Sequence, residues 1–139
     1  MSQVPPQLPP PTNRALAPVL GAVTYIALLV GVWGALSLAL DRDVVDYPDA
    51  GPLLGPAMAA AAIIVTWLVS WWVARAGHPL RGALIATVGS YAGMLVVALI
   101  GYSLEAVAHF AISPFTVAAA LLSPLVVVAT WAMSRSARR

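Results

Sequence analysis

Glu105 and His109 form the pair of titratable side chains that comes closest to a chemical site in this sequence. They are four residues apart, so on one helix they share a face. A carboxylate beside an imidazole can relay protons near neutral pH, and an ionisable residue inside a membrane-spanning segment is a functional candidate by default. Glu105 is, however, already the 24th residue after Arg81, which places the pair at the outer end of an apolar stretch, where a hydrated charge costs little. A proton or ion site and an interfacial ion pair both stay open.

A second polar group lies in segment 41–49, which carries Asp41, Asp43, Asp46 and Asp49. Carboxylates at this density can hold a hard cation such as Ca²⁺. An EF-hand loop needs glycine at its sixth position and glutamate at its twelfth, and counting from Asp41 these positions hold Asp46 and Pro52. We therefore expect an acidic surface loop, with cation binding left open.

For most other kinds of reactive site, the chain lacks the side chains that the chemistry requires. There is no cysteine, which excludes disulfides, thiolate metal sites and cysteine nucleophiles. The two histidines, His78 and His109, fall in different loop regions on opposite sides of the expected fold. Serine and threonine hydroxyls in the apolar stretches have no base within reach to activate them. We expect no enzyme activity, no metal and no cofactor.

The elements that must position these residues are membrane-spanning helices. The chain is 61% hydrophobic and 9% charged, whereas soluble domains carry about 25% charged residues. A helix needs about 20 apolar residues to cross the hydrocarbon core. Four stretches of the chain that carry no charged residue meet this length, and they predict an all-α, four-helix transmembrane bundle. The four spans are expected at about residues 15–40, 52–74, 82–104 and 113–134.

The charges predict how the bundle is oriented. Six of the seven arginines lie before the first span, between the second and third, or after the fourth, and all five acids lie in the other two connections. Basic residues near span ends stay in the cytoplasm. We therefore expect up-down-up-down order with both termini cytoplasmic. All basic residues are arginine and none is lysine, which is typical of a GC-rich bacterial genome and favours a multi-pass protein of a bacterial cell membrane.

Small residues in the third span predict close helix packing. Gly82, Ala86, Gly89 and Gly93 recur at helical spacing, and the last two form a GxxxG motif that lets backbones approach closely. Packing within one chain and self-association explain the motif equally well. Tyr25 and Trp33 lie deep in the first span, where we expect them to pack against other helices.

Pro124 falls in the middle of the fourth span and predicts a kink. Its ring removes one backbone hydrogen bond and leaves the carbonyl of Ala120 without its usual partner. Ser123 or a neighbouring helix is expected to satisfy this carbonyl.

The termini complete the domain organisation. Residues 1–13 are rich in proline and predict a disordered cytoplasmic tail, residues 14–134 form the membrane domain, and residues 135–139 form a basic cytoplasmic tail. The expected function is that of an accessory or scaffold protein without chemistry of its own. Its partners would be the lipid bilayer and another membrane protein or itself, and no nucleic acid. The alternative is a small oligomeric transporter or channel with Glu105 and His109 at its outer mouth.

Overall fold

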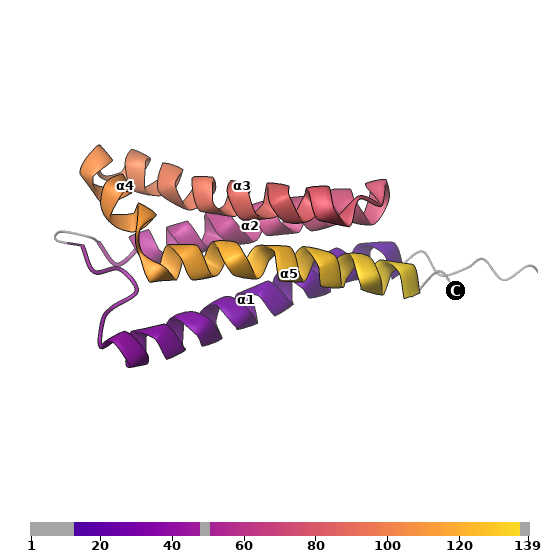
Figure 1. Ribbon diagram of the computed structural model, residues 1–139, viewed down its shortest axis with the longest axis horizontal. Helices are drawn as coiled ribbons and strands as arrows, with labels where there is room; N and C mark the ends of the chain where they lie inside the picture. The colour runs from indigo at the N-terminus through magenta and orange to yellow at the C-terminus, as the bar shows by residue number, and fades with distance from the viewer. Residues whose placement is uncertain (1–12, 48–50, 137–139) are drawn as a thin grey trace, which may run out of the picture.

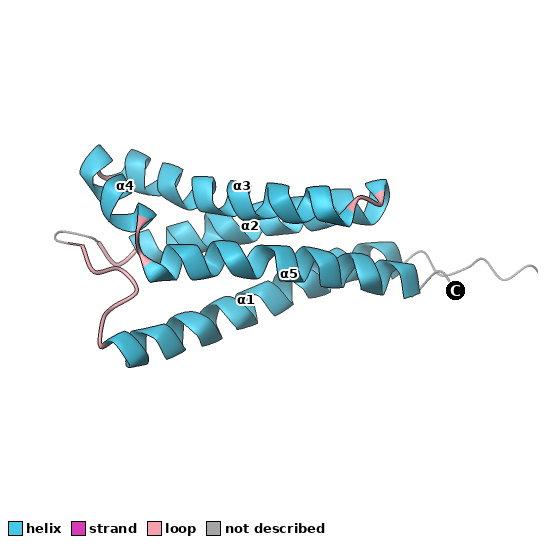
Figure 2. Ribbon diagram, viewed as in Figure 1, coloured by secondary structure: helices cyan, strands magenta, loops and turns pink. Residues whose placement is uncertain are grey.

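The computed structural model describes residues 13–47 and 51–136, with side chains from Leu16 onward. This part of the chain is all-α and contains no strand, which confirms the predicted fold class (Figure 2). The Pro-rich segment 1–12, Asp49 and residues 137–139 lie outside the described residues. The helices are α1 (Asn13–Leu40), α2 (Leu54–Ala76), α3 (Pro79–Gly101), α4 (Leu104–Ala111) and α5 (Pro114–Ser136).

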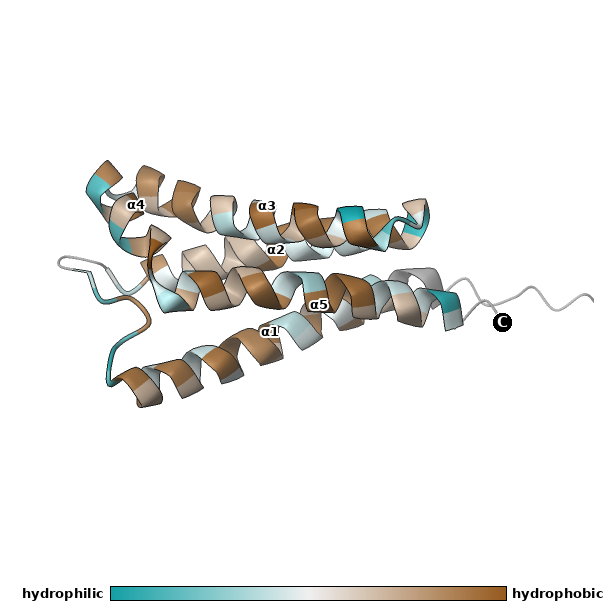
Figure 3. Ribbon diagram, in the orientation of Figure 1, coloured by the Kyte–Doolittle hydropathy of each residue, from teal (hydrophilic) through white to brown (hydrophobic). Residues whose placement is uncertain are grey.

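Four of these helices are long and apolar enough to cross a membrane, which fits a multi-pass membrane protein. The candidate spans are Leu16–Leu40, Leu54–Ala76, Pro79–Gly101 and Pro114–Ser136. Hydrophilic residues gather at the ends of the bundle, while the lengths of the helices are mainly apolar (Figure 3). Large aliphatic side chains such as Leu84 and Val88 point outward, as expected where lipid rather than water surrounds a helix.

Local signals in the sequence set the helix ends. Gly77 ends α2 in the left-handed conformation, with φ of 76°, and its N–H donates to the carbonyl of Val73. Pro79 then begins α3, because its missing N–H has no partner to lose in a first turn. At the other end of α3 the chain breaks after Gly101, and the hydroxyl of Ser103 caps α4 by accepting the N–H of Ala106.

The long helices pack around a common core. The loop after α1, helix α4 and the first turns of α2 and α5 lie at one end of the bundle, here called the loop end (Figure 1). The link between α2 and α3 lies at the other end, together with the last turns of α5. Helix α3 packs against α2 and α5, and α1 packs against α5 and α2. Towards Leu40, α1 diverges from α5 (Figure 1).

Candidate functional site

Glu105 and His109 lie on α4, the short helix at the loop end, and both side chains are exposed. They share a helix, as their spacing requires, but no hydrogen bond or ion pair joins them. The His109 ring instead lies 5.5 Å from the ring of Tyr47 and 5.3 Å from that of Phe110, measured between centroids. Ala106 and Phe110, the residues that directly follow Glu105 and His109, are buried against the bundle. The pair therefore sits on the outside of a packed layer.

The acidic segment also lies at the loop end. Asp41, Asp43 and Asp46 are exposed. No group of three or more His, Asp or Glu residues within the described part of the chain is close enough to hold a metal ion. The segment begins with a tight turn, in which Asp41 has φ of 50° and the Ser37 hydroxyl donates to the carbonyl of Arg42 at 2.6 Å. Ser37 thus closes the end of α1.

Hydroxyl groups meet in the interior of the bundle. The phenol of Tyr25 in α1 donates to the backbone carbonyl of Ala119 in α5 at 2.8 Å. Beside it lie Thr66 in α2 and Ser90 in α3, whose hydroxyl oxygens are 3.3 Å apart. All three side chains are fully buried. Each long helix thus contributes one group to this cluster, here called the hydroxyl cluster.

The hydroxyl cluster is suited to holding helices together rather than to catalysis. It contains no carboxylate, imidazole or amine that could remove a proton from a hydroxyl. In hydrocarbon, where no water competes, hydroxyls commonly bond across helices in this way. Trp33 makes a second link of the same kind, because its indole N–H donates to the carbonyl of Phe115 in α5 at 2.9 Å.

Pro124 lies inside α5, next to this cluster in sequence. The carbonyl of Ala120, which its ring deprives of a backbone donor, accepts the hydroxyl of Ser123 at 2.8 Å. Ser123 is fully buried. The polar group that the proline frees is therefore satisfied within the helix and is not offered to a ligand.

The small residues of α3 face other helices of the same chain. A Cβ atom at Gly89 would come within 2.9 Å of Cγ1 of Val65 in α2, and one at Gly93 would come within 3.7 Å of Cβ of Ala61. Gly82 and Ala86 are buried in the same interface. The GxxxG motif therefore serves packing of α3 on α2, and its glycines are half-buried within this chain.

A different set of small residues remains uncovered. Ala27, Gly31, Gly34 and Ala35 lie along one side of α1 and are exposed. A Cβ atom at Gly31 or Gly34 would meet no other atom within 4 Å. We call this set the α1 stripe. Sequence reasoning missed it although the signal was present, because residues 27, 31 and 35 repeat a small residue at every fourth position.

Sequence reasoning also missed a repeated pairing at the end opposite the loop end. The guanidinium of Arg75 lies 4.7 Å from the ring centroid of Trp71, and that of Arg135 lies 4.3 Å from that of Trp131. Both pairs follow the same pattern of a tryptophan and an arginine four residues later on one helix. Such pairs keep a charge at the headgroup level while the ring remains in contact with hydrocarbon.

Comparison with known proteins identifies a family. The family described as "Family of unknown function (DUF6121)" matches residues 12–139. No curated protein and no solved structure matches the chain.

Proposed function

The chain belongs to this family of unknown function, DUF6121, and from that premise we propose that it is an accessory or scaffold subunit of a bacterial cell membrane. In this role it binds another membrane protein, or a second copy of itself, through its lipid-facing surface and carries out no catalysis. The observation that carries the proposal is the α1 stripe, which exposes small residues along a helix, whereas the GxxxG glycines of α3 contact side chains of α2. In a bilayer, helices gain from close backbone approach, and exposed small residues permit it.

The bundle interior supports the same proposal. Every Asp, Glu, Arg and His side chain that the structure describes lies towards an end of the bundle and is exposed. Among the residues that the structure describes, the buried polar side chains all carry hydroxyl groups, and several of them bond helices to one another. Such an interior suits a rigid support better than a path for ions. The proposal includes up-down-up-down order across the bilayer with both termini in the cytoplasm, which the segregation of arginines from acids favours.

A site-directed cross-link tests the α1 stripe. The chain has no cysteine, so Gly31→Cys provides a single attachment point for a thiol-reactive photo-cross-linker in membranes of the native host. We expect one discrete adduct above the 14.4 kDa chain, because a docked partner places one neighbour at this position. The mass of the adduct distinguishes a second copy from another protein.

Val88→Cys provides the matched control. Val88 lies on α3, a helix that does not contact α1 in the described part of the chain, and its side chain is 66% exposed, so it should contact lipid. We expect no discrete adduct from this position. If neither Gly31→Cys nor Gly34→Cys gives an adduct, docking through α1 is contradicted. The same conclusion follows if Val88→Cys gives as much adduct as these two variants.

Proton flux into liposomes tests the alternative function, that of a transporter or channel. If the chain is a scaffold, liposomes that contain it should acidify no faster than empty liposomes under a proton gradient. Glu105→Gln and His109→Ala should leave this rate unchanged, because both side chains lie outside the packed layer formed by Ala106 and Phe110. Flux above that of empty liposomes that either substitution abolishes would instead establish the transport function.

A further inference from the structure

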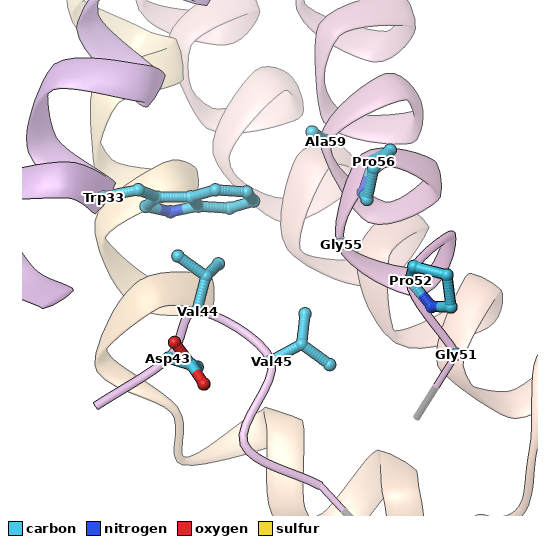
Figure 4. Close-up of a pocket in the computed structure, with 9 residues that line it drawn as sticks. All are labelled: Trp33, Asp43, Val44, Val45, Gly51, Pro52, Gly55, Pro56 and Ala59. Carbon is cyan, nitrogen blue, oxygen red and sulfur yellow. The ribbon is translucent and has the colours of Figure 1, made fainter. Parts of the chain in front are cut away.

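A pocket of about 440 Å³ opens at the loop end, between α1, the loop that follows it and the first turns of α2 (Figure 4). Trp33 lies on the α1 side, Val44 and Val45 on the loop, and Pro56 and Ala59 on α2. No function discussed above uses this pocket. Its size is in the range of sites that bind small molecules or part of a larger amphiphile.

The loop that forms the pocket is held in place by specific contacts. A Cβ atom at Gly55 would lie 3.0 Å from Cγ2 of Val45, so the glycine allows the loop to approach α2 closely. The hydroxyl of Tyr102 accepts the N–H of Gly51 at 2.6 Å. The Tyr47 ring packs edge-on against the Tyr102 ring, with centroids 6.2 Å apart. The pocket is therefore part of the packed structure.

The inside of the pocket suits a hydrocarbon chain. Its walls are the indole ring of Trp33 and the side chains of valine, proline and alanine residues. The indole N–H of Trp33 is already bonded to the carbonyl of Phe115, so the ring presents carbon to the pocket. An apolar chain placed there would leave no polar group of Trp33 without a partner.

The rim of the pocket is acidic. Asp43 lines the pocket, and Val44 lies between its carboxylate and the Trp33 ring (Figure 4). Asp43 forms no hydrogen bond or ion pair with any other described residue. The described part of the loop end carries four carboxylates, of Asp41, Asp43, Asp46 and Glu105, against one guanidinium, of Arg42, so it repels anions.

Apolar walls below an acidic rim match the arrangement of hydrocarbon chain and headgroup in one class of lipid. The pocket lies where α1 ends at Leu40 and α2 begins at Leu54, which is the level where hydrocarbon meets headgroups. A lipid there places its chain against Trp33 and its headgroup at Asp43. A primary ammonium donates hydrogen bonds to a carboxylate, whereas a choline headgroup has no N–H to donate and a phosphatidylglycerol headgroup has a net negative charge. We propose that this pocket binds a phospholipid with a primary-amine headgroup, such as phosphatidylethanolamine.

Native mass spectrometry of the full chain in mild detergent tests this proposal. The protein is titrated separately with phosphatidylethanolamine, phosphatidylcholine and phosphatidylglycerol that carry identical acyl chains. We expect the first lipid to bind about tenfold more tightly than the other two, as one charge-assisted hydrogen bond allows. Equal binding of the three lipids would overturn the proposal.

Two pairs of variants assign the binding to this pocket. Asp43→Asn should reduce phosphatidylethanolamine binding to the level of phosphatidylcholine, while Asp41→Asn, an exposed residue of the same loop that does not line the pocket, should retain the preference. Ala59→Phe should fill the pocket and weaken binding of all three lipids, while Ala60→Phe, its exposed neighbour, should not. A preference that survives both Asp43→Asn and Ala59→Phe, or that Asp41→Asn abolishes equally, would contradict the proposal. The test is independent of the scaffold role, because it measures lipid binding by the isolated chain.

Discussion

The Gly82→Leu variant is expected to lose most of its folding stability, with a cost of about 3 kcal/mol or more. Gly82 is buried where three helices meet. A Cβ atom there would overlap Cγ2 of Val73 in α2 and lie 3.3 Å from Cγ1 of Val127 in α5. Both valines are fully buried, so neither can move away without displacing its own neighbours. The expected result is a large fall in the thermal unfolding midpoint in detergent, followed by tryptophan fluorescence.

Two further glycines of α3 calibrate this result. Gly101→Leu places the same side chain on the same helix where no atom lies within 4 Å, and its cost should stay within about 0.5 kcal/mol. Gly89→Ala should give an intermediate loss, because the nearest atom, Cγ1 of Val65, is 2.9 Å away on a half-buried side chain that has room to turn. If Gly82→Leu and Gly101→Leu unfold at the same temperature, α3 does not pack on Val73 as described.

The spans could be predicted from the sequence because their signal is local. A stretch of more than 20 residues without a charge can be recognised from the sequence alone, and it is long enough to cross a bilayer. The end of α2 could also be predicted from the sequence, because Gly77 allows the left-handed turn and Pro79 can begin the next helix. The sequence predicts that the third span ends at about residue 104, whereas α3 ends at Gly101 and a separate helix follows. The break after Gly101 was missed because the apolar composition continues beyond it, although Ser103 is a residue type that commonly caps a helix.

Helix contacts could not be predicted in the same way, because they are properties of pairs of helices. The small residues of α3 and those of the α1 stripe give similar sequence signals. Gly89 is covered by Val65, whereas Gly31 meets nothing, and only the arrangement of the four helices separates the two cases. The hydroxyl cluster raises the same difficulty. Tyr25, Thr66 and Ser90 are far apart in sequence, and no spacing rule relates residues on different helices.

The Tyr25→Ala variant is expected to show the second large effect, a loss of about 4 kcal/mol. Tyr25 is the largest of the fully buried side chains, and its ring fills the space between α1 and the other long helices. Removing the ring creates a cavity that the tightly packed helices can only partly close. The measurement is again the thermal unfolding midpoint in one detergent. Thr24→Ala, an exposed neighbour on α1, serves as the control and should unfold with the wild type.

Comparison with Tyr25→Phe separates the ring from the hydroxyl group. Phenylalanine keeps the ring and removes only the donor to the carbonyl of Ala119. That carbonyl lies within α5, where a backbone N–H also reaches it, and Thr66 and Ser90 retain their mutual contact of 3.3 Å. Hydrogen bonds between membrane helices contribute about 0.6 kcal/mol on average, so Tyr25→Phe should cost about 1 kcal/mol. A loss from Tyr25→Phe as large as that from Tyr25→Ala would mean that the hydroxyl cluster, rather than packing of the ring, holds α1 to the bundle.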